Sequence, residues 1–119
     1  FTPFSRVQGI MSADDAMILK IRKAIQQRCL FLPHALRQMN RPERMISTKE
    51  IRSVIENGVI IENYPEDARG HSCLMLGFGD AGRAIHVVCA PKEDYLAIIT
   101  AYIPDKTEWL ENWSTRRVK

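Results

Sequence analysis

Residues 72–102 read SCLMLGFGDAGRAIHVVCAPKEDYLAIITAY and contain three stretches that are typical of β-strands. Each stretch spans seven or eight residues and is rich in apolar and β-branched side chains. Turn-forming compositions separate them, at residues 79–82 (GDAG) and 91–94 (PKED). Because such short connections join antiparallel neighbours, we predict an antiparallel meander. Its three strands span residues 72–78, 83–90 and 95–102.

The chain before this meander predicts one more strand and three helices. Ser12 or Asp14 is suited to cap the first helix, and Pro33 suits the first turn of the second. Ser47, with Glu50 three residues later, forms a capping box that begins the third helix. The predicted elements are helices at about 14–28, 34–39 and 47–57 and a strand at 59–64.

Helices that precede a run of strands indicate an α+β fold. We expect the N-terminal helices to pack on one face of a four-stranded, mostly antiparallel sheet and to leave the other face as a working surface. A short C-terminal helix is predicted to begin near Lys106 and to carry Trp109 and Trp113. The length of 119 residues fits one domain, over residues 11–119. Residues 1–10 precede a start-like Met11 and are interpreted as a tag or an upstream extension.

The composition argues against several classes of protein. No apolar run approaches the ~18–20 residues that cross a bilayer, and no basic segment leads into an apolar one as in a signal peptide. The three cysteines, Cys29, Cys73 and Cys89, are odd in number and widely spaced, which argues against a disulfide framework. We therefore expect a reduced cytoplasmic protein with no membrane partner, metal site or cofactor, in which Cys73 and Cys89 are small core residues.

Positive charge is concentrated in one part of the chain. Residues 20–52 carry nine basic and two acidic side chains, a net charge of +7, whereas the whole chain carries +3. Such a distribution is expected to attract polyanions to one end of the molecule. The alternative is an ordinary solvated helical face. The predicted nucleic-acid-binding residues are Arg41, Arg44, Lys49 and Arg52.

Two histidines are candidates for proton transfer. His86 lies in the middle of an apolar strand and needs a partner, for which Thr100 and Tyr102 are the candidates. RNA cleavage needs a base for the 2′-hydroxyl proton, an acid for the leaving 5′-oxygen and cations for the phosphorane charge. The predicted catalytic residues are His34, Arg37, His86 and Tyr102. The alternative is a hydrogen-bonded core histidine at position 86 and a His34 that binds backbone groups at a helix end.

An ordered series of short motifs over residues 32–113 resembles a family of small bacterial proteins known as a domain of unknown function. The series begins with His34-Ala35, Arg37 and Met39 and ends with Ile99-Thr100-Ala101-Tyr102 and a Trp. The stretch between Met39 and Ile46 is longer than in the family pattern, so Arg41 and Arg44 compete for one role. The first helix lies outside the pattern.

The resemblance implies a fold similar to RelE, ParE and BrnT toxins, with helices packed on a small antiparallel sheet. It also implies RNA as a substrate and an antitoxin protein, often of zinc-finger type, as a partner. RelE-like proteins cut mRNA with basic and aromatic side chains on the sheet and the nearby helices. The positions of this chain that match are His34, Arg37, His86 and Tyr102, together with Arg44.

Three functional hypotheses follow. The first is a metal-independent, mRNA-cleaving endoribonuclease of a toxin–antitoxin pair. The second is a non-catalytic module that binds nucleic acid or a protein. The third is a small-molecule enzyme with a pocket around His86, which no cofactor or metal signature supports.

Overall fold

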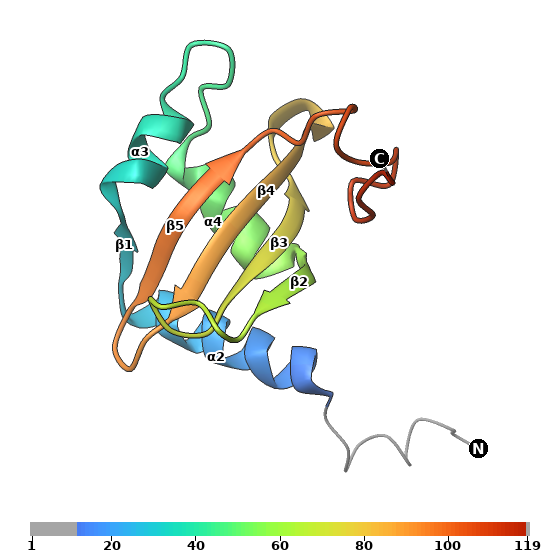
Figure 1. The fold of residues 1–119 in the computed structure, drawn as a ribbon. Helices are drawn as coiled ribbons and strands as arrows, with labels where there is room; N and C mark the ends of the chain where they lie inside the picture. The colour runs from blue at the N-terminus through green and yellow to red at the C-terminus, as the bar shows by residue number, and fades with distance from the viewer. Residues whose placement is uncertain (1–11, 119) are drawn as a thin grey trace, which may run out of the picture.

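The computed structural model describes residues 12–118 as helices packed on a single sheet (Figure 1). The elements in chain order are α2 (Ala13–Gln27), β1 (Cys29–Phe31), α3 (Pro33–Met39), α4 (Thr48–Asn57), β2 (Val59–Tyr64), β3 (Ser72–Phe78), the 3₁₀ turn η1 (Asp80–Gly82), β4 (Ala84–Pro91) and β5 (Leu96–Tyr102). The α+β class is confirmed. The bounds of every helix and strand predicted before residue 103 agree with the structure to within two residues. The interpretation of residues 1–10 as a tag lies outside the described residues.

The sheet has five strands in the order β1-β5-β4-β3-β2, so the prediction of four strands is wrong. The additional strand, Cys29–Phe31, runs parallel to β5, and all other neighbours are antiparallel. Three residues are too few to show the alternation that identifies a strand in a sequence. This strand forms because it pairs with β5, which lies more than sixty residues later in the sequence.

The predicted C-terminal helix is also wrong, because the chain after Tyr102 forms turns instead. The side chain of Asp105 accepts hydrogen bonds from the Thr107 amide and hydroxyl at 2.8 and 3.0 Å, as at a helix start. The turn is not continued, because the Leu110 amide donates to the Thr115 oxygen at 2.8 Å. Trp109 then forms an antiparallel bridge with Arg116. Trp113 adopts a positive φ of 60°, which reverses the chain between the two bridge partners.

Helices α2 and α4 lie together on one face of the sheet, while α3 packs beside β5 at the end of the sheet (Figure 1). Apolar side chains from both helices meet those of the central strands. The fully buried ones include Ile21, Ile51, Val54, Met75, Ile85 and Val87. Cys73 and Cys89 lie directly opposite each other on β3 and β4 and are fully buried, which confirms them as small core residues.

Helix α2 is held to α4 by Arg22 as well as by apolar contacts. The Arg22 guanidinium donates hydrogen bonds of 3.1 Å to the carbonyl oxygens of Ile55 and Gly58. These oxygens lie at the C-terminal end of α4, where helix carbonyls lack partners and the helix dipole favours a cation. One member of the basic region therefore has a structural role.

We expected the opposite face of the sheet to be an open working surface, but it is covered in part. Residues 105–118, named here the C-terminal segment, contact it over β2 and β4. Trp109 of this segment is 3% exposed and its ring meets the His86 ring of β4. Arg116 forms an ion pair with Glu62 of β2. Within residues 12–118 no helix has the length and apolar character needed to span a bilayer.

Candidate functional site

Five exposed or half-exposed cations follow one another along α3, the connection to α4 and the first turns of α4. They are Arg37, Arg41, Arg44, Lys49 and Arg52, named here the α3–α4 cations. Two acidic side chains, Glu43 and Glu50, lie in the same stretch of chain. The contacts of these two carboxylates decide how much positive charge the stretch presents to solvent.

Both carboxylates are neutralised by other residues. Glu43 pairs with Arg41 at 3.3 Å, and Glu50 is 3% exposed and pairs with Arg83 of the β3–β4 turn at 2.9 Å. Within the described part of the chain, the other four α3–α4 cations have no acidic partner. The stretch therefore presents a net positive charge to solvent.

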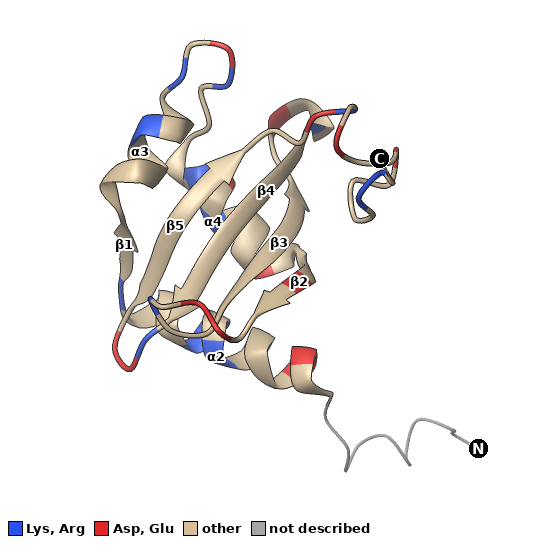
Figure 2. Ribbon diagram, viewed as in Figure 1, with Lys and Arg blue, Asp and Glu red and all other residues tan. Residues whose placement is uncertain are grey.

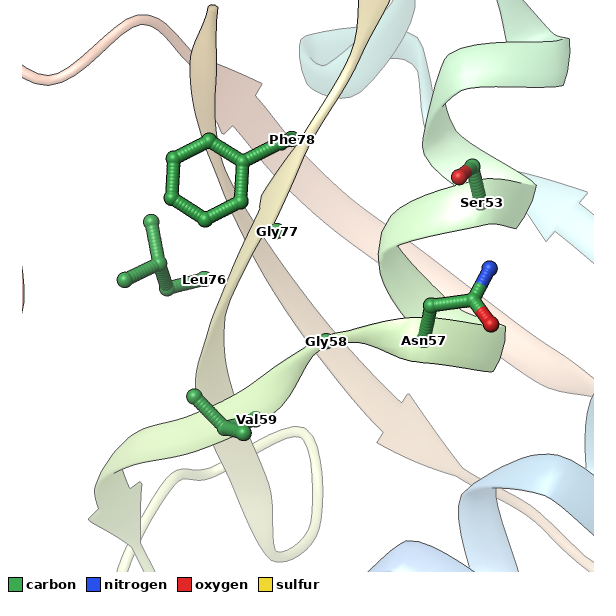
Figure 3. Close-up of a pocket in the computed structure, with 7 residues that line it drawn as sticks. All are labelled: Ser53, Asn57, Gly58, Val59, Leu76, Gly77 and Phe78. Atoms are coloured by element: carbon green, nitrogen blue, oxygen red, sulfur yellow. The ribbon is translucent and has the colours of Figure 1, made fainter. Parts of the chain in front are cut away.

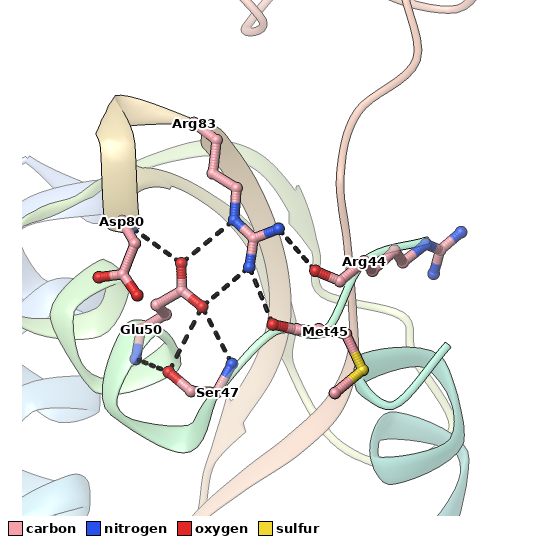
Figure 4. A network of polar contacts seen from close by, with 6 residues as sticks. All are labelled: Arg44, Met45, Ser47, Glu50, Asp80 and Arg83. Carbon is pink, nitrogen blue, oxygen red and sulfur yellow. Dashed lines mark hydrogen bonds and ion pairs between the residues drawn. The ribbon is translucent and has the colours of Figure 1, made fainter. Parts of the chain in front are cut away.

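Glu50 also fixes the shape of the stretch that carries these cations (Figure 4). Its carboxylate accepts hydrogen bonds from the amides of Ser47 and Asp80 at 3.0 and 2.8 Å, so it completes the capping box and holds the β3–β4 turn. Arg83 then donates to the main-chain oxygens of Arg44 and Met45 at 2.6 and 3.0 Å. These contacts hold the loop before α4 against the sheet.

The full basic region of residues 20–52 does not form one positive end. Figure 2 shows basic residues on α3 and the following loop at one end of the sheet, and others on α2 at the opposite end. Lys20 and Lys23 of α2 line a hollow with Lys92 that is separate from the α3–α4 cations. The fold therefore divides the charge of residues 20–52 into two groups, and only the α3–α4 cations lie at the α3 end of the sheet.

The His86 ring is fully buried and both of its nitrogens have hydrogen-bond partners. Nε2 lies 2.7 Å from the main-chain oxygen of Trp113, and Nδ1 lies 3.2 Å from the Tyr102 hydroxyl. A carbonyl oxygen only accepts, so Nε2 carries the proton and Nδ1 accepts from Tyr102. Burial lowers the pKa of His86, which favours this neutral ring. The register confirms Tyr102 as its partner, because the two residues are directly opposite on β4 and β5.

Tyr102 lies within the electrostatic influence of two arginines. Burial raises the pKa of its hydroxyl; the charge of Arg116 lowers it, the charge of Glu62 raises it and the charge of Arg44 lowers it.

His34 and Arg37 are exposed on α3. Among residues 12–118 neither side chain makes a hydrogen bond or an ion pair with His86 or Tyr102. The structure thus brings together two of the four predicted catalytic residues, His86 and Tyr102, by direct contact.

Sequence reasoning missed the residues that cover this pair. Arg116 donates to both carboxylate oxygens of Glu62, at 2.7 and 2.9 Å, and its guanidinium carbon lies 4.6 Å from the centre of the Trp109 ring. Tyr64 donates to Glu62 at 2.5 Å. The hydrogen bonds from Arg116 lower the pKa of Glu62. The alternation of strand residues could have identified Glu62 and Tyr64 as neighbours, because they are two residues apart and share a face of β2.

No three His, Cys, Asp or Glu side chains within residues 12–118 are grouped so as to hold a metal ion. The His86–Tyr102 pair itself offers hydrogen bonding by a neutral imidazole and a phenol.

A comparison with protein-family models matches residues 31–103, more than half of the chain, to a domain of unknown function, DUF4258. Searches among curated proteins and among solved structures returned no match. The matched range begins at the end of β1 and ends just after β5, so it contains α3, α4 and four complete strands. It leaves out α2 and the C-terminal segment. The similarity to RelE, ParE and BrnT toxins stays a prediction.

Proposed function

The chain belongs to the DUF4258 family of domains of unknown function, and from this premise we propose that the protein is an RNA-binding module. The α3–α4 cations bind the phosphate backbone in this proposal. One observation carries it: the acidic side chains of the stretch are ion-paired, and Arg37, Arg44, Lys49 and Arg52 have no acidic partner in the described structure. Cations of this kind bind phosphates without reading sequence.

Binding is favoured over catalysis by the state of His86. A general acid or base must reach the proton that it transfers, directly or through one water molecule. The His86 ring is 0% exposed and its two nitrogens are already bonded to Trp113 and Tyr102. In the described conformation this imidazole is therefore closed to a phosphodiester.

The proposal is tested by fluorescence anisotropy with a labelled single-stranded RNA at low salt. The variant Arg37→Gln/Lys49→Gln/Arg52→Gln should bind at least about tenfold more weakly, because it loses up to three phosphate contacts. The matched control is Lys20→Gln/Lys23→Gln, which removes exposed charges from α2 and should bind like the wild type. No binding by the wild-type protein at low salt, or an equal loss in both variants, would contradict the proposal.

A second candidate is an endoribonuclease of the toxin type, with an antitoxin protein as partner. It is favoured by the hydrogen-bonded His86–Tyr102 pair, because an imidazole and a phenol are groups that can transfer protons in RNA cleavage. The C-terminal segment would have to leave the sheet before RNA reached this pair. The test is cleavage of a model mRNA, with loss of cleavage expected in His34→Ala/His86→Ala. A wild-type protein that leaves the mRNA intact rules this candidate out.

A further inference from the structure

A groove lies at the edge of the sheet, between α4 and the end of β3. It has a volume of about 210 Å³. Figure 3 shows the side chains of Leu76 and Phe78 on one side of β3 and those of Ser53 and Asn57 of α4 on the other. We name it the β3-edge groove.

The groove is open because β2 is shorter than β3 at this edge. The pairing of β2 with β3 extends only to Leu76, which lies opposite Val59. On the other side of β3, pairing with β4 continues, and the Gly79 amide donates to the Arg83 oxygen at 2.9 Å. Main-chain groups of an antiparallel strand alternate between its two neighbours, so N–H and C=O of Phe78 point away from β4, into the unpaired region. These two groups have no main-chain partner among residues 12–118.

The wall formed by the sheet is apolar and exposed. Phe78 is 55% exposed and Val59 is 56% exposed, although most apolar side chains of the sheet are buried. An exposed phenyl ring offers a flat surface on which another ring can stack.

The wall formed by α4 is polar. Ser53 and Asn57 make no side-chain hydrogen bond within the described part of the chain, so a hydroxyl and an amide are available to a ligand. A second hollow of about 170 Å³ shares Ser53 and Phe78 with the groove and is lined also by Lys49 and Asp80. The two hollows therefore adjoin at Ser53 and Phe78, and Lys49 lines the second one together with Glu50, whose carboxylate is paired with Arg83.

We propose that the β3-edge groove binds an unstacked base of single-stranded RNA, stacked on Phe78, while Lys49 holds the adjoining phosphate. A nucleobase combines an apolar face with an edge of hydrogen-bond donors and acceptors, and the groove offers a partner for each. Its polar partners next to the ring are the free main-chain groups of Phe78, which point outward at the edge of the strand. Duplex RNA does not fit, since its bases are paired and stacked within the helix. This proposal rests on the proposed RNA-binding function.

The experiment compares three labelled ligands by fluorescence anisotropy: a short oligouridylate, an abasic ribose-phosphate oligomer of equal length and an RNA duplex. Wild-type protein should bind the oligouridylate at least about tenfold more tightly than the abasic oligomer, which corresponds to the usual free energy of one base–aromatic stack. The variant Phe78→Ala should lose this difference and retain its affinity for the abasic oligomer. Phe78→Tyr, which keeps an aromatic ring, should retain the difference.

The matched control is Leu19→Ala, because Leu19 of α2 is also 55% exposed and lies outside the groove. It should bind all three ligands like the wild type. Equal wild-type affinity for the oligouridylate and the abasic oligomer would overturn the groove proposal and leave the proposed RNA-binding function intact. An equal loss for all ligands in a Phe78→Ala protein with a wild-type melting temperature would also overturn it. Failure of the wild type to bind any of the ligands would overturn both proposals.

Discussion

At the scale of single residues, His86 shows how an apparent catalytic signal can have a structural cause. The ring joins three separate parts of the chain, because it bonds to Tyr102 of β5 and to Trp113 of the C-terminal segment while it belongs to β4. Edge-on contacts with Trp109 and Tyr102, at ring distances of 4.5 and 5.3 Å, fill the remaining space. A buried polar ring with both nitrogens paired stabilises one arrangement of these parts.

The burial of His86 predicts a pH dependence of stability. Its pKa in the folded protein is lowered from the ordinary value of 6.5, so the unfolded chain binds a proton more readily than the folded chain. The contribution of His86 is therefore complete above pH 6.5 and is lost as the pH falls below that value. Urea unfolding from pH 5 to pH 7.5 should show this loss for the wild type and a smaller loss for His86→Gln. The control His34→Gln, at an exposed ring, should follow the wild type; an unchanged slope in His86→Gln would refute the assignment.

The two ion-paired glutamates near the α3–α4 cations differ in their expected effect on stability. Burial raises the pKa of Glu50, but hydrogen bonds from Arg83, Ser47 and Asp80 outweigh it and hold the pKa at about 2. Removing one partner of a buried pair is costly, so Glu50→Gln should lower the free energy of unfolding by about 3 kcal/mol at neutral pH. Glu43→Gln, at an exposed pair, should change it by less than about 1 kcal/mol.

Chemical denaturation at neutral pH measures both changes, and equal effects would contradict this account. The sign of the acid dependence follows from the lowered pKa. Stability from the Glu50 charge is present above the ordinary value of 4.5 and is lost as the pH falls towards 2. Glu50→Gln should therefore lose less stability than the wild type over that range.

At the scale of elements, the C-terminal segment is stabilised by its contacts with the sheet and has no helix of its own. Trp109 is buried at 3% exposure, and the guanidinium of Arg116 lies over its ring. The Arg116–Glu62 pair lies at the surface, where ion pairs contribute little free energy. We infer that the apolar contact of Trp109 holds the C-terminal segment on the sheet and that the Arg116–Glu62 pair orients the segment relative to β2.

Trp109→Ala should therefore release the C-terminal segment. A buried Trp replaced by Ala typically lowers the free energy of unfolding by about 3 kcal/mol or more. The same variant should make His86 reactive towards diethyl pyrocarbonate, because the ring loses its cover. The control Leu110→Ala alters a neighbour that is 38% exposed and should change stability by about 0.5 kcal/mol or less. An unreactive His86 in folded Trp109→Ala would show that other residues exclude the reagent.

At the scale of the whole molecule, the arrangement of charge matters more than the net charge of +3. Ion pairs neutralise Glu43 and Glu50, Arg22 is used within the fold, and the lysines of α2 lie at the opposite end (Figure 2). What remains for a polyanion at the α3 end is a short row of four cations without acidic partners. Four such cations can neutralise a few phosphates of a single strand.

This row predicts the salt dependence of RNA binding. Each phosphate contact with a single strand contributes about −0.7 to the slope of log affinity against log salt concentration, so four contacts give a slope of about −3. Lys49→Gln should make the slope less negative by about 0.7, and Lys20→Gln should leave it unchanged. Anisotropy titrations over a range of salt concentrations measure both values. A wild-type slope near zero would exclude phosphate contacts as the source of binding.

Local chemistry made much of the fold predictable. The capping box of Ser47 and Glu50, the start of a helix at Pro33 and the turn at residues 79–82 each depend on groups only a few residues apart. These local interactions do not depend on the tertiary arrangement of the chain. The sequence alone therefore identified three helices, four strands and their order. The partnership of His86 with Tyr102 was one of two sequence-based options, and only the register selected it.

The remaining features depend on groups that are far apart in the chain. The parallel pairing of Cys29–Phe31 with β5, the Glu62–Arg116 pair and the burial of His86 under Trp109 all join residues more than twenty positions apart. The predicted catalytic site also required two residues far apart in the chain, His34 and His86, to meet. No contact between them occurs in the described residues. The tertiary structure alone decides such contacts, because forming one costs loop-closure entropy that is repaid only when the whole sheet and its cover assemble together.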